Sequence, residues 1–156
     1  MPLTMTLLRL ALYQPDIAAN TGAMMRLCAC LGVAMDIIEP CGFPFDDKRM
    51  RRAGMDYIDH VTWQRHRSWD DFQKQKGVSR LVLLTTKAAR PYTEFSFQKG
   101  DILMVGRESA GVPDDVHNAA AARVVIPMAP PMRSLNVAIS AGIVLSEAVR
   151  QLGATI

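Results

Sequence analysis

The 156-residue sequence is poor in several residue types that particular classes of protein need. Aromatic residues make up only 6%, which argues against a surface on which successive nucleic-acid bases stack. The three cysteines, Cys28, Cys30 and Cys41, have neither the even number of a disulfide framework nor the spacing of a zinc site. We therefore expect reduced thiols in a cytoplasmic protein and no bound metal.

Long apolar runs and several well-known catalytic motifs are also missing. No run has the length of about 20 residues that a transmembrane helix needs, so no membrane association is expected. The apolar segment 7–12 is short and lacks the flanks of a signal peptide. Val112 and Pro113 stand where a Walker motif after Gly106 would have lysine and a hydroxyl residue, which argues against a nucleoside-triphosphate site.

The serine and histidine residues do not form a catalytic motif of the nucleophile-elbow type. Ser109 lacks the G-x-S-x-G context of a hydrolase. His60, His66 and His117 are scattered along the chain, and solvated or capping roles are expected for them.

The remaining composition is that of one globular domain spanning residues 1–156, with 49% hydrophobic residues and a net charge of +3. Apolar segments predict strands over 7–13, 33–38, 57–62, 81–84, 102–105 and 124–126. Capping residues and periodicity predict helices from 20–21 to 31, and over 46–52, 69–76, 113–118 and 136–152. This alternation predicts an α/β fold with a mainly parallel sheet flanked by helices.

Polar or glycine-bearing segments follow the apolar strands at residues 20–22, 85–87, 106–108 and 127–133. In a parallel sheet these segments lie at the edge formed by the carboxyl ends of the strands, where α/β proteins bind ligands. Any one of them could be an ordinary polar loop. Together with a capped helix start at Ser134 and Asn136, they favour a ligand site.

Two groups of cations leave alternatives open. The basic cluster is either a solvated helix face or a strip that binds phosphate; its members are Lys48, Arg49, Arg51 and Arg52. Arg26, within an otherwise apolar helix, either forms a structural ion pair or faces a ligand at the carboxyl edge.

The order and spacing of three motifs resemble those of the SpoU branch of the SPOUT methyltransferases. The motifs are Asn20-Thr21-Gly22 with Arg26, Gly106-x-Glu108-x-x-Gly111, and Ile126-Pro127-Met128 followed by Arg133-Ser134-Leu135-Asn136. Segments 38–40, 46–49 and 51–54 further resemble the TrmL- or YibK-like group, single-domain enzymes that methylate the 2′-oxygen of the wobble cytidine or uridine of tRNA. The resemblance implies a C-terminal trefoil knot, S-adenosyl-L-methionine as cofactor, tRNA as substrate and a homodimer.

The same resemblance implies roles for individual residues. Arg26 and Asn136 match catalytic positions; cofactor contacts fall on Leu84, Gly106, Ile126, Met128 and Ser134. Substrate contacts are expected from Asn20, Glu108 and the basic cluster. Because an arginine stays protonated in proteins, we expect Arg26 to favour a developing alkoxide electrostatically and not to act as a base.

Two other functions stay possible at this point: methylation of another tRNA or ribosomal RNA position, and a noncatalytic RNA-binding dimer. The sequence also departs from common family residues at Arg107, Ala110, Ala138 and Ile139. These departures bear on RNA contacts more than on the cofactor.

Overall fold

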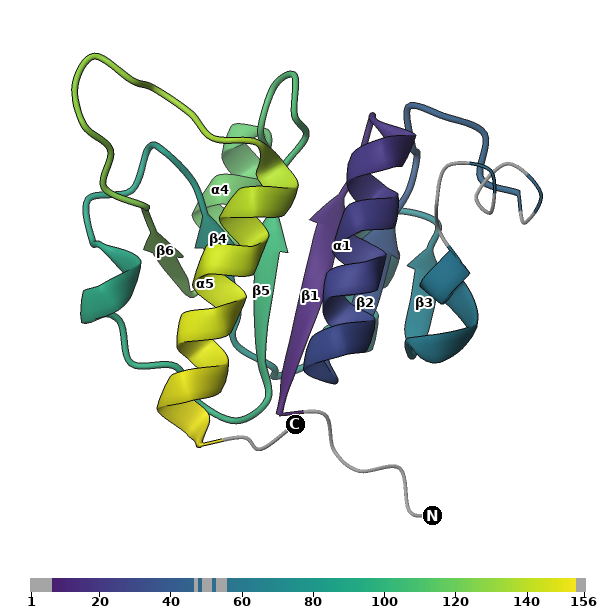
Figure 1. The fold of residues 1–156 in the computed structure, drawn as a ribbon, viewed down its shortest axis with the longest axis horizontal. Helices are drawn as coiled ribbons and strands as arrows, with labels where there is room; N and C mark the ends of the chain where they lie inside the picture. Colours follow the sequence, from purple (N-terminus) through teal and green to yellow (C-terminus); the bar gives the residue numbers. More distant parts are fainter. Residues whose placement is uncertain (1–6, 47, 49–51, 53–55, 154–156) are drawn as a thin grey trace.

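Six strands form one sheet in which every neighbouring pair is parallel (Figure 1). The computed structural model of the chain describes residues 7–46, 48, 52 and 56–153. The strand order is β3-β2-β1-β5-β4-β6. The strands are β1 Leu8–Tyr13, β2 Ala34–Ile38, β3 Trp63–His66, β4 Leu81–Leu84, β5 Asp101–Val105 and β6 Ala122–Val124. The α/β architecture with a parallel sheet is thus confirmed.

Helices cover both faces of this sheet. α1 (Ala18–Leu31) and α5 (Val137–Leu152) lie side by side on one face, as Figure 1 shows. α3 (Trp69–Lys76) and α4 (Asp114–Ala119) pack on the other face through Phe72 and Val116. Two short 3-10 helices, η1 (Asp56–His60) and η2 (Tyr92–Glu94), lie in connections. Within the described ranges, no helix has the length and apolar character needed to cross a membrane.

The core divides into two layers because successive side chains of a strand point to opposite faces. Leu10 and Leu12 of β1 join the layer under α1 and α5, whereas Ala11 and Tyr13 join the layer under α3 and α4. All four side chains are at most 5% exposed. β1 is thus a central strand that is buried on both sides.

Helix ends follow the capping residues only in part. Asn136 caps α5, and its Oδ1 accepts from the N–H groups of Ala138 and Ile139 at 2.9 and 3.2 Å. The expected capping role of residues 20–21 is wrong, since α1 begins at Ala18 after Ile17 and has no side-chain cap. This leaves the amide of Asn20 available to other loops.

The edges of the sheet differ most from the sequence-based expectation. The strand predicted over 57–62 is absent from these residues, because Asp56–His60 form η1, with Ile58 buried in the layer under α1. The edge strand is instead β3, whose polar sequence Trp63–His66 gave no apolar signal. Part of the expected helix over 46–52 lies outside the described residues.

His66 corrects a second expectation. It is 3% exposed and its Nε2 lies 2.8 Å from Oδ1 of the buried Asp36, so it is neither solvated nor a cap. Arg9 donates to the same carboxylate from Nε at 2.7 Å. Three strands, β1, β2 and β3, therefore share one buried polar contact.

β6 ends at Val124, two residues before the end of the expected segment 124–126, because the chain changes partners there. The N–H of Thr85 donates to the carbonyl of Val124 at 2.9 Å, on the β4 side. The N–H of Val125 donates to the carbonyl of Arg90, and the N–H of Tyr92 donates to the carbonyl of Val125, both at 2.9 Å. Segment 85–92 therefore passes around the end of β6.

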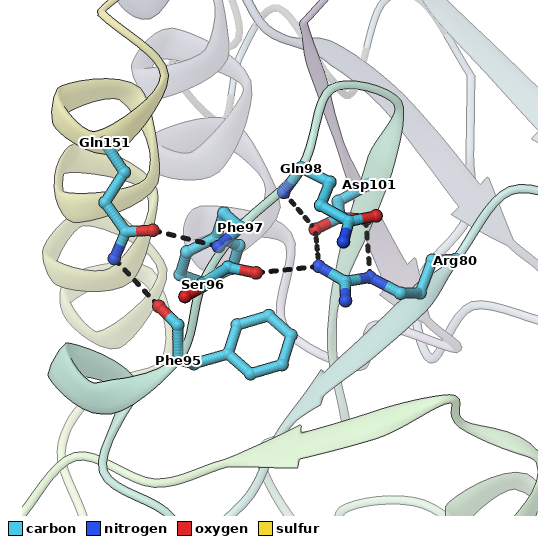
Figure 2. Close-up of polar contacts among 7 residues, drawn as sticks. All are labelled: Arg80, Phe95, Ser96, Phe97, Gln98, Asp101 and Gln151. Atoms are coloured by element: carbon cyan, nitrogen blue, oxygen red, sulfur yellow. Dashed lines mark hydrogen bonds and ion pairs between the residues drawn. The ribbon is translucent and has the colours of Figure 1, made fainter.

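A second polar cluster fixes the opposite end of α5 (Figure 2). The buried Asp101 accepts from Arg80 through Nε at 2.9 Å and Nη2 at 2.6 Å. Gln151 of α5 accepts from the N–H of Phe97 and donates to the carbonyl of Phe95, both at 2.9 Å. The C-terminal half of α5 is thereby joined to the segment before β5, while its N-terminus lies at the carboxyl edge of the sheet.

Candidate active site at the carboxyl edge of the sheet

A cavity of about 490 Å³ lies where the carboxyl ends of β4, β5 and β6 meet the start of α5. Its apolar wall includes Leu83, Leu84, Val105 and Ile126. The polar groups around it come from the loops after the strands and from the two helix starts, namely Asn20, Thr85, Thr86, Arg107, Glu108, Ser134, Asn136 and Ser140. An apolar wall with a few convergent polar groups is typical of a small-molecule site.

The loop over residues 106–111 is closed by backbone contacts. The N–H of Arg107 donates to the carbonyl of Gly111 at 3.0 Å, and the N–H of Gly111 donates to the carbonyl of Arg107 at 2.9 Å. A Cβ at Gly106 would lie 2.8 Å from the backbone of Gly111. Gly106 is therefore required by the close approach of the loop, and Gly111 by its φ of +61°.

A chain of hydrogen bonds joins three loops around the cavity. Oε1 of Glu108 accepts from the amide of Asn20 at 3.2 Å, and Oδ1 of Asn20 accepts from the amide of Asn136 at 3.1 Å. On its other side, Glu108 accepts from the N–H of Asp16 at 3.3 Å and donates its own N–H to Asp16 at 3.2 Å. The hydroxyl of Ser109 also donates to Asp16.

The two carboxyl groups of this chain titrate differently. The pKa of Asp16 is lowered from 3.8 to about 2 by its side-chain hydrogen bond with Glu108 and by the Ser109 hydroxyl and the Glu108 N–H. Burial raises the pKa of Glu108, and the hydrogen bond with Asp16 raises it further. Asp16 is thus the ionised member of the pair, while Glu108 retains its proton to higher pH.

Most of the residues expected at the site do line the cavity. They are the expected cofactor contacts Leu84, Gly106, Ile126, Met128 and Ser134, with Asn20, Glu108 and Asn136. Their roles stay predictions. Lys48 and Arg52 are exposed and do not line the cavity; Arg49 and Arg51 lie outside the described residues.

Arg26 does not line the cavity of its own chain. It is exposed on α1, and its guanidinium carbon lies 5.0 Å from the centre of the Tyr57 ring. The structural ion pair, one of the two alternatives left open for this residue, is not found among the described salt bridges. Its expected position near the carboxyl edge of its own sheet is therefore not supported by this chain alone.

Sequence reasoning missed Asp16, which the local pattern places only in a turn after β1. Its carboxylate is the acceptor that holds both Glu108 and Ser109. It follows a strand just as the other site segments do, so the rule that identified those segments could also have found it. Cavity residues such as Ile17 and Ser140 gave no signal, because nothing distinguishes them from ordinary helix residues.

The lining suits an organic molecule with both apolar and polar parts. Leu84, Ile126 and Met128 offer an apolar surface, and their loops also present backbone groups. Among the residues described, no group of three or more histidine, cysteine, aspartate or glutamate side chains is arranged to hold a metal ion.

The decrease in the free energy of unfolding at acid pH should depend on Asp16. Because its pKa is about 2 in the folded chain against 3.8 ordinarily, its contribution is present above about pH 4 and is lost as the pH falls toward 2. Asp16→Asn should therefore lower the free energy of unfolding at neutral pH, and its deficit from wild type should shrink over this range. Urea unfolding across the range measures this. Ser109→Ala, which removes one donor, should give a smaller change of the same form; a deficit that does not vary with pH would contradict the assignment.

Comparisons with known proteins identify the family of the chain. Residues 7–146 match the model of the SpoU rRNA Methylase family. A tRNA (cytidine(34)-2'-O)-methyltransferase of Beijerinckia indica is 63% identical over 148 residues, covering 93% of this chain and 92% of that protein.

Solved structures agree with this sequence match. A structure from work on the 2-OH methylation of C/U34 on tRNA has a TM-score of 0.88 and 36% identity, and the match covers 95% of this chain and 97% of that one. An AdoMet-bound rRNA methyltransferase from Sinorhizobium meliloti has a TM-score of 0.82 and 28% identity, covering 93% of this chain and 56% of that one. Because the family model matches residues 7–146, which is almost the whole chain, the chain belongs to the SpoU rRNA Methylase family.

Proposed function

We propose that this protein transfers a methyl group from S-adenosyl-L-methionine to the 2′-oxygen of the wobble cytidine or uridine of tRNA. The observation that carries the proposal is the cavity, which brings together Asn20 of α1, Glu108 of the loop after β5, and Ser134 and Asn136 of the segment before α5. The relative that is 63% identical, a tRNA (cytidine(34)-2'-O)-methyltransferase, supports the choice of reaction and nucleotide.

The cavity suits the proposed cofactor. Leu84, Ile126 and Met128 would contact the adenine, with the backbone of their loops available for hydrogen bonds, and Gly106 and Ser134 would complete the pocket. S-adenosylmethionine supplies an electrophilic methyl group on a sulfonium, so no metal is required. The AdoMet-bound structure of the Sinorhizobium meliloti rRNA methyltransferase supports this choice.

The protein groups would act mainly by position and charge. A ribose hydroxyl must lose its proton during attack, and a guanidinium that stays protonated can stabilise the developing negative charge. Arg26 would provide this stabilisation. Asn136, hydrogen-bonded to Asn20 and fixed at the start of α5, would orient the ribose.

The assay that tests the function uses labelled S-adenosylmethionine and total tRNA, followed by mapping of the labelled nucleotide. We expect label on the 2′-oxygen of nucleotide 34 of particular tRNAs. Label at another position, or in ribosomal RNA, would establish the related reaction instead. Absence of transfer with intact tRNA binding would identify a noncatalytic RNA-binding protein.

The proposal includes a homodimer formed through the outer face of α1 and α5. Large apolar side chains are exposed at the starts of these helices, with Ile17 at 45% just before α1, Leu135 at 42% just before α5 and Ile139 at 56% in the first turn of α5. Ile17 and Leu135 also line the cavity, so a second copy on this face would cover both the apolar side chains and the cavity mouth. A cytoplasmic location, where tRNA and reduced thiols occur together, completes the proposal.

A second copy would also explain the position of Arg26. This residue is exposed on α1 and lies outside its own cavity, although it belongs to the expected catalytic set. We propose that it acts at the cavity of the partner copy. The basic cluster, whose members Lys48 and Arg52 are exposed, would contact tRNA phosphates.

The proposed fold includes the trefoil knot at the C-terminal end. Its support is the path of segment 85–92, which has backbone hydrogen bonds to both sides of residues 124–125. The part of the chain that continues past Val125 to α5 would then have passed through the loop that segment 85–92 forms.

The cofactor pocket should not tolerate a side chain at Gly106. Gly106→Val, and even Gly106→Ala, would place a Cβ 2.8 Å from the Gly111 backbone and displace the loop. We expect cofactor affinity to fall by about tenfold or more, equivalent to ~1.4 kcal/mol, while the far-ultraviolet circular dichroism is retained. Calorimetry with S-adenosylmethionine measures this. Unchanged affinity in the folded variants would refute the pocket assignment.

Charge on the outer face of α5 should disrupt the dimer. Ile139→Glu would require burial of an unpaired carboxylate in the proposed interface, so sedimentation should show a monomer. Val78→Glu is the matched control, because Val78 is fully exposed on the turn between α3 and β4. Equal sedimentation of both variants and wild type would contradict the interface.

Arg26→Ala should lower the rate of methyl transfer by about a hundredfold or more and leave cofactor affinity nearly unchanged. Arg26→Lys should rescue poorly because it lacks the planar fork. Mixed dimers of Arg26→Ala with Gly106→Val test action across the interface. They should regain activity, because one cavity then has both an intact pocket and an intact partner arginine. Continued inactivity of exchanged dimers would exclude action in the partner's cavity.

A further inference from the structure

A second cavity, of about 350 Å³, lies beside the sheet edge formed by β6. One side of it is the segment 87–90 that follows β4, and the other is the segment 121–123 at the start of β6. Cationic side chains come from Lys87, Arg90 and Arg123, and the other lining residues are alanines. In the part of the chain that the structure describes, no acidic residue lines this cavity, which we call the β6 groove.

Hydrogen bonds hold the backbone of Lys87 and Arg90 and the guanidinium of Arg123. The N–H of Lys87 donates to Oγ1 of Thr85 at 3.2 Å, and the carbonyl of Arg90 accepts from Val125 at 2.9 Å. Arg123 donates from Nη1 to the carbonyls of His117 and Ala120 at 2.7 and 3.3 Å. The positive charges therefore have fixed attachment points before any ligand arrives.

These cations are not used in ion pairs with the described acidic residues. The described salt bridges involve Arg9, Arg65, His66, Arg80 and Arg150. Lys87 and Arg90 are also exposed, whereas the side chains of Arg9 and Arg80 form ion pairs with Asp36 and Asp101. Lysine and arginine side chains that are gathered in one groove without carboxylates suit a phosphate group.

The β6 groove and the cofactor cavity are lined by residues that are adjacent or nearly adjacent in sequence. Thr85 and Thr86 line the cavity, and the next residue, Lys87, lines the groove. Val125 lines the cavity in the same way, only two residues after Arg123. An RNA whose reacting ribose lies at the cavity would thus have neighbouring phosphates within reach of the groove.

We propose that Lys87, Arg90 and Arg123 bind a backbone phosphate of the RNA next to the nucleotide that is methylated. This inference rests on the proposed function, and it adds an RNA contact separate from the basic cluster. Because Lys87 and Arg90 are exposed, the backbone of an RNA strand can reach both of them. The alanines between them leave room for a phosphate and offer no aromatic ring for a base.

The test compares two double variants with the same change of charge. Lys87→Gln with Arg90→Gln removes two cations of the groove, and Arg123 is left in place because it supports the end of α4. Lys74→Gln with Lys99→Gln is the control, since both lysines are exposed, one on α3 and one before β5. Binding of total tRNA is measured by fluorescence anisotropy over a range of KCl, and cofactor affinity by calorimetry.

The groove variant should bind tRNA several-fold more weakly with unchanged cofactor affinity. Its salt dependence should flatten by about 0.7 in log–log slope for each phosphate that the variant no longer neutralises. The Michaelis constant for tRNA should rise in the methylation assay, whereas the control should match wild type. Unchanged tRNA affinity and salt slope in the groove variant, or an equal loss of affinity in the control, would overturn the proposal that the groove binds an RNA phosphate. A wild-type protein that binds no tRNA would overturn the proposed function as well, which separates the two failures.

Discussion

The hydrogen bonds from Asp16 through Glu108 and Asn20 to Asn136 are the interaction on which the site depends most. They join the loop after β1, the loop after β5, the first turn of α1 and the start of α5. Hydrogen bonds to charged groups contribute about 1.5–3 kcal/mol each, more than neutral ones. Asp16 stays ionised and Glu108 is half-buried, so these hydrogen bonds have an electrostatic component that the apolar cavity wall cannot supply.

Each end of α5 is fixed by a different polar contact. At the carboxyl edge of the sheet, Asn136 caps the helix and donates from its amide to Asn20. At the opposite edge, Gln151 forms hydrogen bonds with the backbone of Phe95 and Phe97. Between them, Val144 and Leu145 are fully buried against the sheet. The helix therefore has little freedom to move Asn136 relative to the cavity.

Segment 85–92 lies at both the proposed cofactor site and the proposed RNA contact. Its first residues line the cavity, its middle carries Lys87 and Arg90, and its end pairs with Val125. A single backbone arrangement thus sets the position of both groups of side chains.

Predictions from the sequence were most accurate where the apolar or capping pattern of a segment matched the environment of that segment in the fold. β4 and β5 are continuous apolar segments buried on both faces, and α3 begins at the capping residue Ser68. It failed at β3, where Trp63–His66 form a mostly polar edge strand, and at His66, whose partner Asp36 is 30 residues away. Most of the residues that were expected at the site do line the cavity, since they lie near the ends of strands that share one edge.

The sequence by itself determined the alternation of strands and helices, the caps of α3 and α5, and the residues gathered at the carboxyl edge. These depend on periodicity and on capping groups within a few residues of one another. Only the tertiary structure decided that Asp16 holds the Glu108 loop, that Arg26 lies outside its own cavity, and that Lys87 and Arg123 share a groove. Those contacts join residues distant in the chain, and their partners are chosen by how the sheet brings its loops together, which no local pattern encodes.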